Sequence, residues 1–173
     1  NTPIFNRLKS NLQLLFQPTI ICESLQDIDF QELYDNNITT IFCDVDNTIV
    51  GTKKKHVPIN YLTLFNNIKS IGFTIILLSN NSDKDRINII SKELNIPGIA
   101  FSCKPFPFTT KKILNQYTIN PKNSVIIGDQ LLTDVLHGKL LNMSTILLEP
   151  VSKNELTPLR RIQYLIERLL IKI

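Results

Sequence analysis

Residues 39–48 read TTIFCDVDNT, an apolar run that ends in two aspartates. β-Branched and aromatic side chains dominate the run, which is typical of a buried strand. Asp44 and Asp46 follow it at positions i and i+2. Side chains at that spacing in an extended chain project to the same side. Two carboxylates packed together repel each other and raise the pKa of one of them.

The acid pair has two interpretations. In a structural protein it is a loop with acidic caps, which gains nothing from the repulsion. In an enzyme that transfers phosphoryl groups, one ionised carboxylate binds a hard cation and attacks phosphorus, while the other holds a proton for the leaving oxygen. The pair alone does not decide between these interpretations.

Four more apolar segments predict strands, and helical patterns separate them. The predicted strands cover 73–78, 99–102, 124–127 and 144–148. The predicted helices cover about 58–70, 83–94, 108–116 and 131–141. The alternation predicts a parallel sheet of five strands with helices on both faces, in which ligands bind beyond the carboxyl ends of the strands. We expect residues 1–173 to form a single domain.

Polar side chains follow two of these strands. Ser79 and Asn80 end the strand at 73–78, and a hydroxyl and an amide there can bind phosphate oxygens. Lys104 follows the strand at 99–102, where its compact positive charge suits both a phosphate and an aspartate nucleophile. Each motif by itself also fits ordinary loop chemistry.

The strand at 124–127 is followed by GDQLLTD. Gly128 permits a sharp exit from the strand, and Asp129 then lies at the carboxyl edge, placed to complete a magnesium site. Asp134 falls near the first turn of the next helix, where it also fits a simple cap. The joint order of acid pair, serine, lysine and acid pair, each after a strand, favours a catalytic site over independent loops.

These motifs resemble those of the haloacid dehalogenase (HAD) superfamily of aspartate-nucleophile phosphatases, over about residues 39–148. The strings LSNN at 78–81 and GDQLLTDVLHG at 128–138 are similar to its class IIIA subfamily, which includes phosphatidylglycerophosphate phosphatases. The resemblance implies a three-layer, Rossmann-like α/β fold with a five-stranded, mainly parallel sheet. His137 stands where this subfamily leads us to expect a small residue, and we expect it to alter packing only.

By this resemblance, Asp44 is the nucleophile that forms an aspartyl-phosphate, and Asp46 is the acid and base. The Asp44 carboxylate, the Asp46 backbone carbonyl and Asp129 would hold Mg²⁺.

The resemblance also implies roles around the transferring phosphoryl group. Ser79, Asn80 and Lys104 would bind it, and Lys104 would offset the charge of the nucleophile. Thr48 would fix the loop, and Asp134 would orient Lys104 or a metal-bound water.

The gaps between motifs bear on the substrate. The stretches from Asp46 to Ser79 and from Ser79 to Lys104 each hold one predicted helix and one strand. HAD enzymes often carry a cap domain in one of these gaps, and neither has room for it. An open site can accept a phosphate that a membrane, a polymer or a protein presents; alternatively, a neighbour in an oligomer acts as the cap.

The net charge is +4 and the isoelectric point is about 9.0. This mild excess favours an anionic substrate or an anionic membrane surface, and we expect no nucleic-acid partner. Three lysines at 53–55 follow the acid pair, either as a solvated turn or as a basic rim that draws an anionic headgroup.

The flanks at about 4–16 and 157–173 are amphipathic and basic. Each is either a helix that covers the core or an interfacial helix in peripheral contact with a membrane. In the second case the basic residues of the closing flank would face lipid headgroups. They are Arg160, Arg161, Arg168 and Lys172.

Cysteine use and hydropathy bear on localisation. The chain has three cysteines and no C-x-x-C pair, so a disulfide framework or zinc site is not expected, and a reducing compartment fits. We expect Cys43 and Cys103 to be small core residues. No run of about 18 apolar residues occurs, and the opening Asn-Thr-Pro does not resemble a signal peptide. The cytoplasm or an organelle matrix is the expected location, rather than secretion.

Taken with the resemblance, these patterns favour a magnesium-dependent phosphatase that converts phosphatidylglycerophosphate to phosphatidylglycerol. One alternative is a capless phosphatase of a soluble metabolite or a nucleic-acid end, which would predict an oligomer or a strongly basic groove. Another is an inactive scaffold that binds a phosphorylated ligand, against which the intact acid pair and Asp129 argue.

Overall fold

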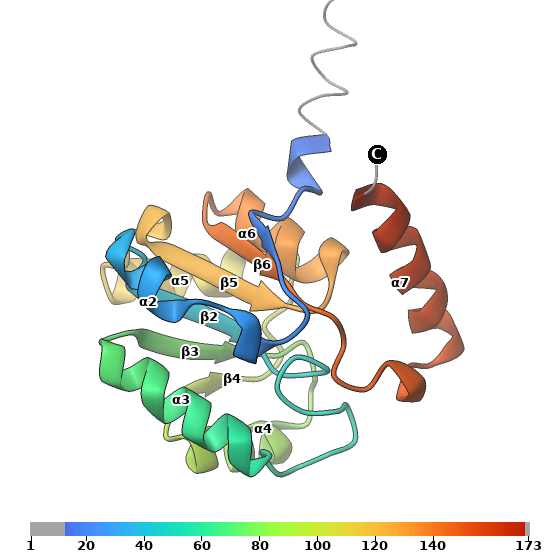
Figure 1. Ribbon diagram of the computed structural model, residues 1–173, viewed down its shortest axis with the longest axis horizontal. Helices are drawn as coiled ribbons and strands as arrows, with labels where there is room; N and C mark the ends of the chain where they lie inside the picture. The colour runs from blue at the N-terminus through green and yellow to red at the C-terminus, as the bar shows by residue number, and fades with distance from the viewer. Residues whose placement is uncertain (1–12, 172–173) are drawn as a thin grey trace, which may run out of the picture.

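The computed structural model describes residues 13–171, in which six strands form one parallel sheet of order β1-β6-β5-β2-β3-β4 (Figure 1). The strands are β1 Ile20–Ile21, β2 Thr40–Asp44, β3 Thr74–Leu78, β4 Gly98–Ile99, β5 Ser124–Gly128 and β6 Ser144–Leu147. A strand is found at each predicted place, but the one expected at 99–102 is only the two-residue strand Gly98–Ile99. The expected strand number was wrong, because β1 adds a sixth strand beside β6, and every pairing is parallel.

Helices cover both faces of the sheet, which gives three layers. They are α2 Phe30–Asp35, α3 Ile59–Ile71, α4 Lys84–Leu94, α5 Phe108–Gln116, α6 Leu136–Leu140 and α7 Pro158–Ile171. Core residues of α2, α3 and α4 pack on one face, while those of α5 pack on the other. The predicted helix at 131–141 is divided into a π-helical turn, Leu131–Val135, and α6. One helix lies in each gap between the motifs, so no large cap is evident.

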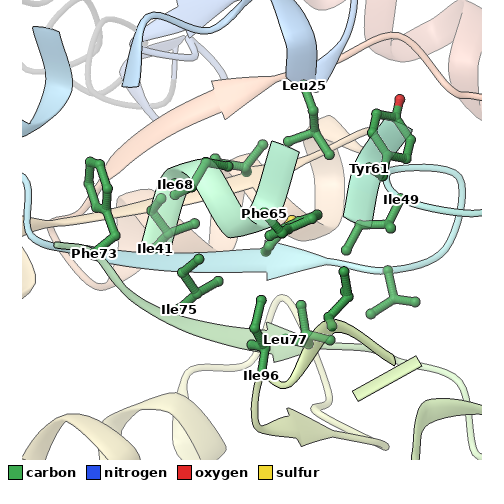
Figure 2. Packing of buried hydrophobic residues seen from close by; sticks show 14 of the residues in the cluster. Leu25, Ile41, Ile49, Tyr61, Phe65, Ile68, Phe73, Ile75, Leu77 and Ile96 are labelled. Carbon is green, nitrogen blue, oxygen red and sulfur yellow. The ribbon is translucent and has the colours of Figure 1, made fainter. Parts of the chain in front are cut away.

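Alternating side chains of β2 explain the two core layers. Ile41 and Cys43 join the cluster beneath α3, whereas Phe42 joins the cluster beneath α5. Figure 2 shows Phe65 and Ile68 of α3 lying against the strand face that carries Ile41. Because both faces of the central strand are buried, its backbone is held rigidly up to its last residue, where the predicted acid pair begins.

The predicted burial of the cysteines is confirmed in one case and wrong in the other. Cys43 is buried in β2, but Cys103 is exposed on the loop before α5 and adopts a left-handed backbone with φ of 62°. All three cysteines are free thiols.

Helix α7 lies beside the carboxyl edge of the sheet (Figure 1). Polar side chains of the helix bind residues at that edge. Arg168 donates to Glu149 at 2.9 Å and to the Leu148 carbonyl at 3.1 Å, and Tyr164 donates to Glu149 at 2.6 Å. The apolar side chains are mostly exposed to solvent. These exposed residues are Leu159, Ile162, Leu165, Ile166, Leu169 and Leu170.

The other amphipathic flank, 4–16, lies mainly outside the described residues. Within residues 13–171, no helix is long and apolar enough to cross a membrane.

Candidate active site

Asp44, the last residue of β2, is held through both carboxylate oxygens. Lys104 Nζ donates to Asp44 Oδ1 at 2.6 Å, and Thr48 Oγ1 donates to Asp44 Oδ2 at 3.0 Å. The same ammonium donates to Asp134 Oδ1 at 2.7 Å and to the Leu78 carbonyl at 3.1 Å. A lysine has three donors, so the ammonium is fully satisfied and fixed in position.

Burial and charge act in opposite directions on this ion pair. Burial raises the pKa of Asp44 well above its usual range, the Lys104 ammonium opposes that shift, and nearby carboxylates add to it. Burial tends to lower the pKa of Lys104, but Asp134 and Asp44 outweigh it and the pKa is raised. Lys104 is therefore a permanent cation whose charge favours the ionised form of Asp44.

Asp46 lies at the same edge, between a serine and an arginine. Ser79 Oγ, directly after β3, donates to Asp46 Oδ2 at 2.7 Å. Arg86 Nη1 lies 2.9 Å from Asp46 Oδ1, and the same guanidinium donates to the carbonyls of Lys54 and Gly51. Arg86 thus ties the acid to the loop that follows it.

Arg86 was not among the site residues predicted from the sequence. It is 2% exposed and lies on the buried face of α4, next to Ile87. An arginine is rarely buried without a partner, so its place on the apolar face of a predicted helix was a usable signal.

Asn80 braces the loop that carries Lys104. Its amide nitrogen donates to the Lys104 carbonyl at 2.7 Å, while its Oδ1 accepts from the Lys104 backbone N–H at 2.8 Å and from Ser102 Oγ at 2.9 Å. The Lys104–Pro105 peptide of this loop is cis. The amide of Asn80 is thus engaged by the loop, and phosphate binding by this residue stays a prediction.

His137 supports the same loop from α6 and does more than fill space. Its Nδ1 lies 3.1 Å from the Pro105 carbonyl, and its Nε2 lies 2.9 Å from Thr110 Oγ1. Because a carbonyl only accepts, Nδ1 carries the proton and the Thr110 hydroxyl donates to Nε2. Burial lowers the pKa of His137 to about 4, although the Pro105 carbonyl opposes the shift.

Asp129 follows β5 and completes a cluster of buried carboxylates. Oxygen atoms of Asp44, Asp129 and Asp134 all lie within 4.8 Å of one another. Burial, and then the charge of Asp134, raises the pKa of Asp129 to about 7. Asp129 Oδ1 is buried, and no hydrogen-bond partner for it is found among residues 13–171. Closely spaced carboxylate oxygens with an unsatisfied acceptor fit a hard divalent cation such as Mg²⁺.

Gly128 is needed here because Asp134 approaches its backbone. A Cβ at position 128 would lie 2.3 Å from Asp134 Cγ, which is closer than real side chains come. Asp134 Oδ2 accepts from the Gln130 backbone N–H at 3.1 Å, while its Oδ1 holds Lys104. The contact with Gly128 therefore sets the position of the lysine's second partner.

Arg160 reaches this cluster from α7. Its Nη2 lies 3.1 Å from Asp129 Oδ2 and donates to the Asp129 carbonyl at 3.3 Å, and its Nη1 lies 3.2 Å from Glu167 Oε2. Glu167 is buried and accepts from the Leu132 backbone N–H. In the alternative in which the closing flank contacts a membrane, Arg160 was expected to face lipid headgroups. It points inward instead, because two buried carboxylates bind it.

The fold and the site together define a phosphatase of the haloacid dehalogenase superfamily. The chain belongs, within it, to the family described as "Mitochondrial PGP phosphatase", whose model matches residues 4–152.

Two curated relatives carry phosphatase names. The chain is 30% identical over 144 residues to "Probable phosphatase YqeG" of Bacillus subtilis, and the aligned region covers 83% of each protein. It is 26% identical over 170 residues to "Phosphatidylglycerophosphatase GEP4, mitochondrial" of Saccharomyces cerevisiae, and the aligned region covers 89% of this chain and 91% of that protein.

Solved structures share the fold at lower identity. A putative HAD family hydrolase from Streptomyces avermitilis superposes with a TM-score of 0.53 at 15% identity, covering 65% of this chain and 72% of that one. A second structure is the 3-deoxy-D-manno-octulosonate 8-phosphate phosphatase of Moraxella catarrhalis, solved with magnesium and phosphate ions. It superposes with a TM-score of 0.51 at 15% identity, covering 82% of this chain and 91% of that one.

Proposed function

We propose that the protein is a magnesium-dependent phosphomonoesterase that converts phosphatidylglycerophosphate to phosphatidylglycerol through an aspartyl-phosphate on Asp44. The observation that carries the mechanism is the position of Asp44, ion-paired with Lys104 and within 4.8 Å of Asp129. The family match and the name of the yeast relative support the lipid substrate.

In the first half-reaction, a carboxylate oxygen of Asp44 attacks phosphorus and the bond to the leaving oxygen breaks. Asp46 gives its proton to that oxygen, and Arg86 stabilises the carboxylate that remains. In the second half-reaction, Asp46 takes a proton from water as the water oxygen attacks phosphorus and releases Asp44. Ser79 keeps Asp46 in position. To contact the phosphoryl oxygens, Ser79 and Lys104 would each exchange one of their present hydrogen bonds for one to the substrate.

The Asp44 and Asp129 carboxylates, with the Asp46 carbonyl, would hold Mg²⁺. A bound magnesium ion would supply positive charge for the phosphoryl oxygens. Lys104 adds a second positive charge beside the nucleophile, and Asp134 and Thr48 keep both partners in place. Asn80 would position the Lys104 loop.

The membrane part of the proposal rests on α7 and on the open site. We propose a single domain in the cytoplasm or an organelle matrix, in peripheral contact with a membrane through the exposed apolar side chains of α7. That side chain pattern suits the boundary between headgroups and acyl chains. A lipid phosphate also reaches an uncapped site without having to be enclosed.

Phosphate release from phosphatidylglycerophosphate in mixed vesicles tests the function. We expect release that requires magnesium, and none with Asp44→Asn. Activity retained by Asp44→Asn would overturn the nucleophile. Turnover of soluble nucleotide or sugar phosphates, with none on the lipid, would overturn the substrate and leave the phosphatase chemistry.

A further inference from the structure

A cavity of about 620 Å³ lies beside Asp46. The loop after the acid pair forms one wall, with Lys53 and Lys54. The other wall is formed by Glu155, in the segment before α7, and by Arg160, in the first turn of α7. Cavities of roughly 300–1,000 Å³ hold small molecules or headgroups. Asp46 is the proposed proton donor to the leaving oxygen, so this cavity lies on the leaving-group side of the reaction.

The cavity is lined by more positive than negative charge. Asp46 pairs with Arg86, and Arg160 pairs with Asp129 and Glu167, so these charges are already balanced. That leaves Lys53 and Lys54 of the lining against the Glu155 carboxylate. The two lysines are exposed, so neither is committed to a buried ion pair. This excess predicts that an anion binds here.

Arg160 has donor capacity left after its two ion pairs. Its Nη1 and Nη2 lie against Glu167 and Asp129, but its buried Nε has no hydrogen-bond partner among the described residues. Because the Nε atom is buried, a phosphate in the cavity would interact with the charge of the guanidinium rather than with this donor.

We propose that this cavity is a subsite for a second anionic group of the substrate, a phosphodiester in the leaving alcohol. The inference rests on the proposed function, because it takes the monoester at Asp44 as the reacting group. The scissile phosphate lies at Asp44, the leaving oxygen at Asp46, and the diester among Lys53, Lys54 and Arg160. The subsite selects substrates that carry two phosphates separated by a short alcohol.

A matched pair of soluble substrates tests selectivity. Glycerol 3-phosphate and the deacylated headgroup, glycerophosphoglycerol phosphate, share the reacting monoester and differ in the diester. We expect kcat/KM of the wild type to favour the headgroup by at least about tenfold, the value of one charge-assisted contact. The doubly substituted Lys53→Gln/Lys54→Gln protein should lose most of this preference, mainly through KM.

Lys55→Gln is the control for charge loss in this loop, because it removes one lysine outside the cavity lining, and the single Lys53→Gln and Lys54→Gln proteins are compared with it. We expect it to keep the wild-type preference. Arg160→Gln should lower activity on both substrates, since Asp129 loses a partner, and it should also reduce the ratio between them. If the ratio of kcat/KM for the headgroup to kcat/KM for glycerol 3-phosphate is the same in the wild type and the double variant, the subsite is overturned.

Inhibition separates the subsite from the proposed function. Glycerophosphoglycerol, which carries the diester alone, should inhibit hydrolysis of p-nitrophenyl phosphate far better than glycerol does. The double variant should lose this inhibition, while Lys55→Gln should keep it. Inhibition without turnover of the headgroup would overturn the proposed substrate only. No inhibition, with normal turnover of the aryl phosphate, would overturn the subsite.

Discussion

Lys104 shows how a single side chain can organise a catalytic site. Its three donors are shared between the nucleophile Asp44, the supporting Asp134 and the end of β3 at Leu78. The ammonium therefore cannot move toward one partner without leaving another buried acceptor unsatisfied. This rigidity keeps the nucleophile in one position before substrate arrives, which favours catalysis by fixed charges.

The role of Asp46 as proton donor predicts a dependence on the leaving group. Asp46→Asn cannot protonate an alkoxide, so kcat/KM for glycerol 3-phosphate should fall by about 100- to 10,000-fold. p-Nitrophenolate leaves without a proton, and the loss on p-nitrophenyl phosphate should be much smaller. Steady-state kinetics on both substrates measure the difference. Equal losses would argue that Asp46 acts by holding the loop instead.

At the scale of elements, the site is held by supports that come from helices. His137 of α6 bonds to the Pro105 carbonyl, Arg86 of α4 pairs with Asp46, and Arg160 of α7 pairs with Asp129. The strand ends bring the acids together, and the helices fix the loops between them. Substitutions on these helices should therefore change the site although they lie outside its motifs.

The link between α6 and the Lys104 loop predicts a pH dependence of stability. The pKa of His137 is about 4 in the folded protein and about 6.5 in an unfolded chain. The unfolded state binds more protons between these values, so acidification destabilises the fold. From pH 7 to pH 5 this group should remove about 2 kcal/mol from the free energy of unfolding.

Urea unfolding of the wild type and His137→Gln at both pH values measures this. The substitution removes the titrating group, so the stability advantage of the wild type should shrink by about that amount at pH 5. An advantage that is the same at both pH values would contradict a neutral, buried His137.

Helix α7 predicts a surface effect. Leu165 is 62% exposed, so Leu165→Glu should leave the melting temperature almost unchanged while weakening binding to anionic vesicles. Asn67→Glu adds the same charge to an exposed position on α3 and should bind like the wild type. Vesicle sedimentation compares the three proteins. Equal binding of all three would place the membrane contact elsewhere.

At the scale of the whole molecule, the site holds more negative than positive charge. Three buried carboxylates pair with two cations, Lys104 and Arg160. Without divalent cations this charge opposes folding, so Asp129→Asn should raise the melting temperature at pH 7. With magnesium, the wild type should have the higher melting temperature. A bound ion stabilises the folded state, and the variant lacks one of the carboxylates that would bind it.

Calorimetry with chelator and with magnesium tests this reversal, and calcium serves as a second hard cation. A wild type that melts at the same temperature in both conditions would contradict a cation site at Asp44 and Asp129.

The sequence predicted those parts of the fold in which the chain repeats a local pattern. Long apolar runs such as 73–78 bury both faces and read clearly as strands. Strand β1 has two residues, both exposed at the sheet edge, and its apolar run at 20–22 is too short to be distinguished from a loop. The acids were predicted because each follows a strand, whereas Arg86 and Arg160 reach the site from helices, and their contacts depend on tertiary packing.

The attachment of α7 by its polar side makes ionic strength a physical control on this protein. Ion pairs to Glu149 and Asp129, rather than apolar burial, hold most of the helix in place. Such pairs weaken as salt shortens the screening length, which is about 8 Å at physiological ionic strength and about 3 Å at 1 M. The buried Arg160–Asp129 pair is screened much less than the partly exposed Arg168–Glu149 pair. Concentrated salt should therefore loosen the C-terminal half of α7 before its first turn.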